Sequence, residues 1–357
     1  GAAERKEFYA DMQGSGAYEA EYPRREEVPA GTAYVIDLTA MSKYEVRKEF
    51  AHYGAAVFFD KHRRLLAVYK SHHERDSSPR GRRPEAVSGK LVYAPGSARG
   101  RLTDPLARSR EWENAKFSFR CSLISLATLR EHLMMCHWIV SNRVHIASRE
   151  ELGAEHPVRR ILSLFSFRSG AINFVSTVSL MQEDMLLHRA SPFTAAGVLQ
   201  AFEDTAARWR YQTFDQMEQA KGLPKGFLPY MEDAKECWEV FHAFFAGYID
   251  LYFPTEADVT DDPEIQRYWQ SLERVSNVRW QPDAEGERYR SPAEPFKAPP
   301  LPQDGPREWR GQYNGYGLPQ LSKAALVDQL THTAFWVCGM HEVRQPQPIR
   351  PHAREHS

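Results

Sequence analysis

The chain has 357 residues, which suits one large domain or two small ones. Hydrophobic residues make up 42% and charged residues 26%, and this balance excludes an extensively disordered protein. With 46 basic and 47 acidic residues the net charge is -1, so no global field attracts nucleic acid or an anionic membrane, and we expect no nucleic-acid partner. The aromatic content of 12% favours a broad helical core or an apolar pocket.

Cysteine spacing and hydropathy indicate the cellular compartment in which we expect the protein. No apolar run in the sequence is long enough to cross a bilayer, and the first residues lack the apolar stretch of a signal peptide. The four cysteines are scattered without a paired spacing, which favours reduced thiols: Cys121, Cys136, Cys237 and Cys338. We therefore expect a cytoplasmic protein without a transmembrane segment.

The first third of the chain predicts an arm, a small sheet and a loop. Residues 1–30 are polar and read as an irregular arm. Short β-rich runs follow at 34–38, 56–59 and 65–69, with a helix-like stretch at 43–50, so we expect a small sheet packed against a helical body. Residues 71–110 are rich in Arg, Ser, Pro and Gly and predict a solvated loop.

The rest of the chain is mainly helical in pattern. Helical periodicity covers 112–187, where a central segment is apolar nearly all round, and continues at 194–219, 233–253 and 255–275. Proline and glycine gather at 277–318, which predicts a long surface excursion rather than a second core. A last helix starts at a Ser322 cap, and the proline-rich tail at 346–357 is expected to be irregular, which leaves a single domain over 31–345.

Two histidine groups lie on apolar helices. His132 and His137 are five residues apart, so a regular α-helix would place them roughly 140° apart around its axis, and only a local π-bulge would bring them together. His341 and Gln345 are four apart and share one face. Nitrogen and oxygen ligands from two helices suit iron or zinc, with manganese less favoured, although a hydrogen-bonded core histidine is the commoner structural role.

Four ordered segments of this sequence resemble the catalytic domain of lipoxygenases. They are EWENAKFSFRCSLISLATLREHLMMCH, EHPVRRILSLFSFRSGAIN, LPYMEDAKECWEVFHAFFAGYIDLYFPTEADVTDDPEIQRYW and LVDQLTHTAFWVCGMHEVRQ. The resemblance runs from about Tyr34 to Arg344 and implies a mainly α fold. That fold is a lipoxygenase-like helical catalytic domain with a small N-terminal β-rich region and no PLAT domain.

The resemblance also implies a non-heme iron site. The family uses two histidines five apart on its central helix, a histidine and a further residue from a second helix, and a C-terminal Ile carboxylate. An ungapped count from Trp112 places the first ligand on Ala127 and the second on His132, with His137 on a non-ligand position, His341 as third ligand and Gln345 as fourth. Ala127 has no donor atom, and the chain ends twelve residues after Gln345 without that Ile.

Several arrangements would repair such a site. A shifted π-bulge would bring His137 to His132 and His341. Glu342 or the tail (His352, His356, Ser357) would otherwise fold back, or a partner chain in a homo- or hetero-oligomer would complete the site and cover the short C-terminal side. The remaining alternative is that no metal binds, so the cofactor expectation is iron, with manganese or no metal as alternatives.

The family's pocket would lie beside this site. A substrate-pairing Arg of some members falls on Phe167, with Arg168 one place over. The pocket residues that we expect are Phe165, Phe167, Arg168, Ile172, Phe335 and Trp336, and their aromatic character suits an apolar lipid, polyketide or isoprenoid. Core packing is the alternative role for at least half of them.

Three functions follow from these residues. The first is a non-heme iron dioxygenase in which hydrogen is removed beside an alkene of an apolar unsaturated substrate and dioxygen traps the radical, with His132, His341 and His137 as the catalytic and metal residues. The second is a metal-free isomerase or cyclase that uses histidine as acid and base. The third is a non-catalytic subunit that binds an apolar ligand and is completed by a partner chain.

Overall fold

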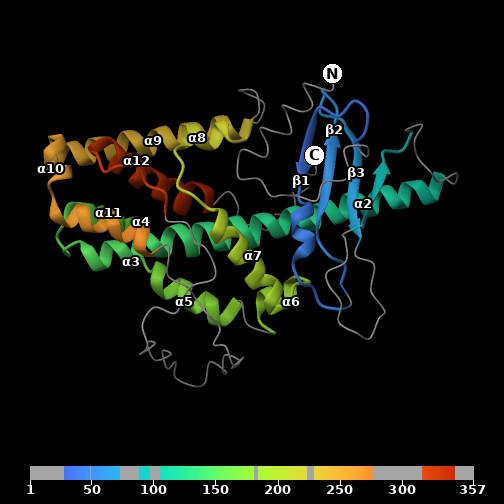
Figure 1. Cartoon of the computed structure of the whole chain (residues 1–357), viewed down its shortest axis with the longest axis horizontal. Helices are drawn as coiled ribbons and strands as arrows, with labels where there is room; N and C mark the ends of the chain where they lie inside the picture. The colour runs from blue at the N-terminus through green and yellow to red at the C-terminus, as the bar shows by residue number, and fades with distance from the viewer. Residues whose placement is uncertain are drawn as a thin grey trace, which may run out of the picture.

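The chain folds into a long helical body with a small sheet at one end (Figure 1). The structure, a computed structural model, describes residues 28–48, 50–72, 88–96, 105–180, 184–222, 229–275 and 316–341. Most of the predicted arm, the predicted excursion at 277–318 apart from its last three residues, and the whole predicted tail lie outside the described residues.

The sheet is an antiparallel meander of four strands in the order β1-β2-β3-β4. The strands are β1 Tyr34–Asp37, β2 Ala55–Phe59, β3 Leu65–His72 and β4 Ser88–Tyr93. Val57 lies opposite Val68, and Val68 opposite Val92, so one apolar face runs across three strands and packs on Trp112 and Ala115. The expected small sheet against a helical body is thus confirmed.

Two expectations about this end of the chain were wrong. β4 lies inside the range predicted as a loop, because Leu91-Val92-Tyr93 pairs with β3 and buries Val92. The predicted helix over 43–50 is replaced by the short 3-10 helix η2, Thr39–Lys43. Val46 forms a β-bridge with Phe193, and the Arg47 N–H donates to the Pro192 carbonyl at 2.8 Å, so pairing with a distant segment overrides the local periodicity.

One continuous helix connects the sheet to the far end of the molecule. It consists of α2 Pro105–Ser125, the π-helical segment η3 Leu126–Ser141 and α3 Asn142–Glu151. Figure 1 shows this rod crossing the whole molecule, with the other helices arranged along it.

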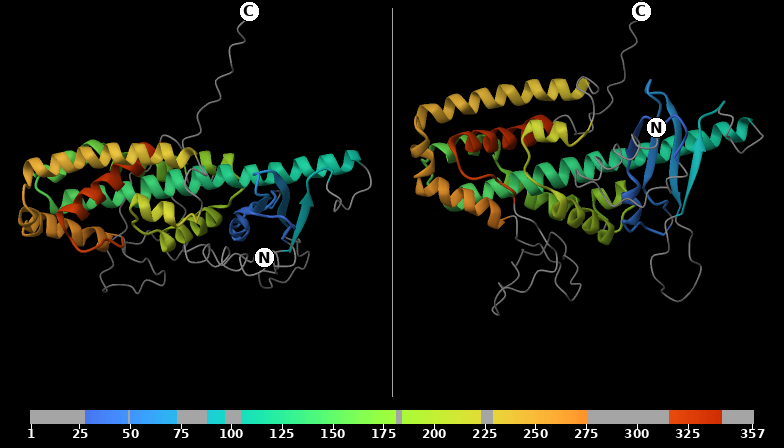
Figure 2. Two further views of the ribbon diagram at one scale, coloured as in Figure 1. Left: turned by 90° about the horizontal axis from the view of Figure 1, so that it is seen from above. Right: turned by 45° about the horizontal axis from the view of Figure 1, so that its top comes forward.

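The remaining helices cover the rod from both sides, as the further views show (Figure 2). In chain order they begin with α4 Pro157–Phe165, α5 Ser169–Leu180, α6 Leu186–Ala190 and α7 Ala195–Arg208. The others are α8 Phe214–Gln219, α9 Pro229–Tyr252, α10 Glu256–Thr260, α11 Pro263–Val275, α12 Lys323–Ala334 and the π-helical η4 Phe335–Met340.

Local chemistry sets several of these boundaries. The Ser322 side chain accepts from the Ala325 N–H, which confirms the predicted cap of α12. α9 ends at Tyr252, two residues before Pro254. The predicted helical block at 194–219 is divided into α7 and α8 by extended residues that bring Tyr211 into the core.

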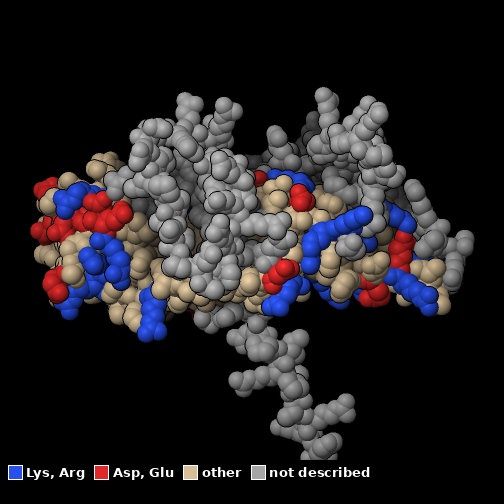
Figure 3. All heavy atoms as spheres, turned by 90° about the horizontal axis from the view of Figure 1, so that it is seen from below, with Lys and Arg blue, Asp and Glu red and all other residues tan. Residues whose placement is uncertain are grey.

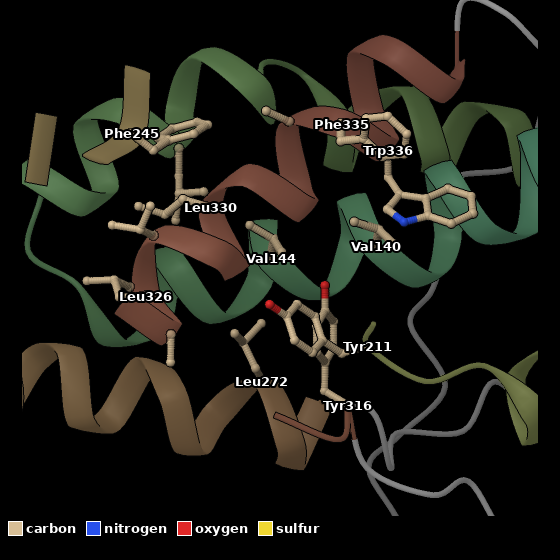
Figure 4. Packing of buried hydrophobic residues seen from close by; sticks show 14 of the residues in the cluster. Val140, Val144, Tyr211, Phe245, Leu272, Tyr316, Leu326, Leu330, Phe335 and Trp336 are labelled. Carbon is tan, nitrogen blue, oxygen red and sulfur yellow. The ribbon is translucent and has the colours of Figure 1, made fainter. Parts of the chain in front are cut away.

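The main core lies where α3, α9, α11 and α12 meet (Figure 4). The cluster contains Val140 and Val144 of the rod, Leu272 of α11, Leu326 and Leu330 of α12 and Phe245 of α9, and all six are buried. Each fully buried side chain of this size contributes roughly 1.5–3 kcal/mol, so this junction fixes the position of α12 relative to the rod.

None of the described helices is both long enough and apolar enough to cross a membrane. On the face seen from below, basic and acidic side chains lie interspersed over the described surface (Figure 3).

Candidate metal centre

Two π-helical segments meet at the three histidines. In η3 the Asn142 N–H donates to the His137 carbonyl, five residues earlier. In η4 the His341 N–H points to the Trp336 carbonyl, five residues earlier, and also to the Cys338 carbonyl. A π-turn widens the helix, so side chains five residues apart come to lie on one side, and such turns are frequent at functional sites.

The result is a compact cluster of His132, His137 and His341. One nitrogen from each ring lies within 4.8 Å of the other two. The His137 and His341 Nε2 atoms are 3.0 Å apart, and the ring centroids of His132 and His341 are 4.4 Å apart. The π-bulge that the sequence required for His132 and His137 to meet is therefore present.

His137 is held by a buried amide from α5. Asn173 is 2% exposed, and its Nδ2 donates to the His137 carbonyl at 3.0 Å and to Asn142 Oδ1 at 2.7 Å. Both partners are acceptors, so Oδ1 must face the imidazole, where it lies 3.0 Å from His137 Nδ1. Nδ1 thus carries the proton, and the Nε2 lone pair points at the cluster.

Electrostatics favours the neutral form of this imidazole. Burial lowers the pKa of His137, and the neighbouring His341 lowers it further, against the opposing hydrogen bond to Asn173. A neutral imidazole is the form that binds a metal ion.

The donor set fits a transition-metal ion. Imidazole nitrogen suits iron, zinc, copper and nickel. Two nitrogens that each lie about 2.1 Å from one ion, at right angles, are about 3 Å apart. The Nε2 atoms of His137 and His341 are 3.0 Å apart, which matches that separation.

The cluster lies five residues further along the rod than the ungapped count placed it. His132 and His137, rather than Ala127 and His132, supply the pair from the central helix. The structure thus brings His137 to His132 and His341, as the first of the expected arrangements requires. Gln345, Glu342 and the tail residues His352, His356 and Ser357 lie outside the described residues.

The six expected pocket residues do not share one environment. Phe335 and Trp336 are buried in the main core, and Phe165 packs against Phe241 and Phe245. Phe167, Arg168 and Ile172 are exposed, with Phe167 at 70%. Core packing thus accounts for three of them, and a pocket formed by the others stays a prediction.

A small cavity lies at the start of η3. It has a volume of about 10 Å³ and is lined by Met41, Tyr44, Ser125, Leu126, Leu129, Arg130, Phe193 and Ala201. A space of this size holds about one water molecule, so it cannot enclose an acyl chain.

Three histidines outside the cluster have structural partners. His52 Nδ1 is 3.0 Å from the Ser42 carbonyl, His156 caps α4, and His242 Nε2 is 3.2 Å from Asp328. Asn173 and Asn142 received no role from the sequence. An amide within the apolar stretch GAINFVSTVSL was the available signal, because a buried polar side chain requires partners.

Comparison with known proteins places the chain near lipoxygenases. No family model matches it. It is 26% identical to the polyunsaturated fatty acid lipoxygenase ALOX15 of Mus musculus over 183 residues, 50% of this chain and 28% of that protein. The Homo sapiens ALOX15 is 23% identical over 178 residues, 48% of this chain and 26% of that protein.

Solved structures show the same fold. A lipoxygenase crystallised with arachidonate has a TM-score of 0.63 at 15% identity, covering 94% of this chain and 45% of its own. The manganese lipoxygenase of Gaeumannomyces graminis has a TM-score of 0.56 at 17% identity, covering 85% of this chain and 46% of its own. The match therefore spans less than half the length of these proteins.

Proposed function

Because this chain is a divergent lipoxygenase-like protein in sequence and fold, we propose that it is a metal-dependent oxygenase of an apolar unsaturated substrate. The observation that carries the proposal is the convergence of three imidazole nitrogens within 4.8 Å on two π-helical segments. His132, His137 and His341 would hold the ion, with Gln345 as a further candidate. Iron is the preferred ion and manganese the alternative.

A bound iron or manganese ion would supply one-electron redox chemistry at this point. The protein side chains hold and orient it. Asn173 fixes the tautomer of His137 and anchors the backbone of η3 through the His137 carbonyl. The relatives named as polyunsaturated fatty acid lipoxygenases, and the neighbour crystallised with arachidonate, support an unsaturated lipid as the substrate class.

Metal titration of the purified chain tests the proposal. We expect one Fe²⁺ or Mn²⁺ per chain by calorimetry and elemental analysis, and loss of that ion in His137→Ala and His341→Ala. His242→Ala is the matched control, because this histidine pairs with Asp328 away from the cluster. Failure of the wild-type chain to bind either ion, or unchanged binding by His137→Ala, would contradict the proposal.

The hydrogen bonds of Asn173 to His137 allow a second, quantitative test. Asn173→Ala should weaken metal binding by roughly 10–100-fold, the usual effect of removing a partner of a ligating histidine. Ser176→Ala, also on α5, removes a buried hydroxyl that donates to the Asn173 carbonyl, and should leave the affinity nearly unchanged. Equal effects of the two substitutions would show that Asn173 acts only through folding.

One observation favours a second candidate, a metal-free isomerase or cyclase. The His137 and His341 Nε2 atoms are at hydrogen-bonding distance, and burial lowers the pKa of His137, so a neutral imidazole is available as a base. Arachidonate and its hydroperoxide distinguish the two functions. Dioxygen consumption with arachidonate that is abolished by a chelator supports the oxygenase. Anaerobic rearrangement of the hydroperoxide that resists the chelator and is lost in His341→Ala supports the isomerase.

A further inference from the structure

α9 forms an outer edge of the molecule (Figure 2). It packs on α12, η4 and α8 through one face, on which Met231, Ala234, Trp238, Phe245 and Ile249 are buried. A surface helix with such an inward apolar stripe normally carries polar side chains on its opposite face.

The opposite face of α9 is apolar instead. Val240 is 69% exposed, Phe244 50% and Leu251 73%. With Gly247 they follow one another at intervals of four, three and four residues, the spacing that aligns side chains along one side of a helix. We call these four residues the α9 ridge. Their spacing is the one that a second helix recognises when it packs along the first.

Gly247 is a second, independent sign of a partner. Glycine inside a helix costs roughly 0.5–1 kcal/mol relative to alanine. A Cβ built at Gly247 meets nothing within 4 Å, so no neighbour among the described residues requires a glycine there. Between Phe244 and Leu251 the missing side chain leaves a notch, into which a side chain of an approaching helix fits.

Charge identifies the kind of partner. α9 contains five acidic residues and one lysine: Glu232, Asp233, Glu236, Glu239 and Asp250, against Lys235. All five acidic side chains are exposed, and four of them border the same flank of the ridge. One of these four, Asp250, already pairs with Lys323 at 2.6 Å, so the charge offered to a partner comes from the other three. An anionic membrane, or a second copy of this helix packed antiparallel, would bring like charges together, whereas a basic helix would pair with this flank.

From these observations we propose that the α9 ridge docks an amphipathic helix of a partner protein, whose apolar side is bordered by lysine or arginine. Val240, Phe244 and Leu251 would be the apolar anchors, and the Glu236 and Glu239 flank would select for positive charge. The ridge lies on the side of α9 that faces away from α12, so the docking surface is distinct from the metal centre.

Fluorescence anisotropy with two synthetic helical peptides tests the proposal on the full chain. One peptide has a leucine face bordered by lysines, and the other has glutamates in place of the lysines. We expect the lysine peptide to bind at physiological salt, and Phe244→Glu to weaken it by about tenfold or more, as for loss of a central anchor. Reversing the flank with Glu236→Lys and Glu239→Lys should shift the preference to the glutamate peptide.

Phe117→Glu is the matched control, since Phe117 is 63% exposed on α2 and lies outside the ridge. Circular dichroism establishes that each variant is folded. Equal binding of both peptides, or an equal loss in Phe117→Glu and Phe244→Glu, would overturn the proposal. Self-association of the wild-type chain that Phe244→Glu abolishes would also overturn it, because the occupant would then be a second copy.

Discussion

Asn173 shows how much depends on one side chain in this molecule. Its amide reaches the His137 ring, the backbone of the rod and Asn142, and all three contacts follow from its burial on α5. The histidines themselves were predictable from the sequence, but their meeting was not, because it requires a helical geometry that the local residues do not specify. The role of Asn173 depends on a contact between residues 36 positions apart, which no local pattern contains.

Two buried tyrosines lead to opposite predictions at this scale. The Tyr268 hydroxyl donates to Gln329 Oε1 at 3.1 Å, so Tyr268→Phe leaves a buried acceptor unsatisfied and should cost roughly 1–3 kcal/mol. Tyr211 is 7% exposed, and its hydroxyl has no hydrogen-bond partner among the described residues, so Tyr211→Phe should be neutral or stabilising. Urea unfolding measures both, and an equal loss in the two variants would contradict this.

At the scale of helices and strands, the sequence predicted correctly those boundaries that neighbouring residues determine. The Ser322 cap and the end of α9 before Pro254 follow from neighbouring residues and were predicted. The helix expected over 43–50 was not found, because Val46 pairs with Phe193, which is distant in the sequence. β4 was missed for the same reason, since only its pairing with β3 distinguishes it from the loop composition around it.

Two helical glycines provide a prediction for α7 and α9. A Cβ at Gly197 would lie 2.0 Å from the Glu45 carbonyl oxygen, so Gly197→Ala must displace α7 and should destabilise the protein by roughly 1–3 kcal/mol. At Gly247 the space is open, so Gly247→Ala should stabilise the isolated chain by roughly 0.5–1 kcal/mol. Thermal unfolding compares the two. If the two substitutions shifted the unfolding temperature in the same direction, the space around the glycine would not be what determines the change in stability.

At the scale of the whole molecule, the core encloses polar and titratable groups together with its apolar side chains. His332 of α12 is 1% exposed, and the rings of Trp209, Tyr211, Tyr316 and Trp336 surround it. Burial lowers the pKa of this imidazole to about 3. The folded protein therefore holds His332 neutral under conditions in which the unfolded chain would protonate it.

This burial predicts a loss of stability in acid. As the pH falls below 6.5, His332 becomes protonated in the unfolded state but stays neutral in the folded state. The free energy of unfolding therefore falls by up to about 1.4 kcal/mol per pH unit until the pH reaches the pKa of His332 in the folded state. His332→Gln should flatten the dependence of the unfolding midpoint between pH 6.5 and 5. Burial lowers the pKa of His137 and His145 in the same direction and leaves a residual slope.

His62→Gln, an exposed position, is the control for this measurement and should leave the slope unchanged. An undiminished acid slope in His332→Gln would contradict the assignment.

The π-helical segment η3 also limits which insertions and deletions can be tolerated between His132 and His137. His132 and His137 meet because η3 repeats its hydrogen bonds five residues apart. Loss of a single codon between them would leave the histidines four apart, a spacing that an ordinary α-helix places on one face. Gain of a codon between the two histidines does not lead to a spacing of this kind. Among small insertions and deletions between His132 and His137, we therefore expect the histidine cluster to survive the loss of one codon. The reverse change, the gain of one codon, would convert an α-helical pair of histidines four residues apart into the π-helical pair seen in this protein.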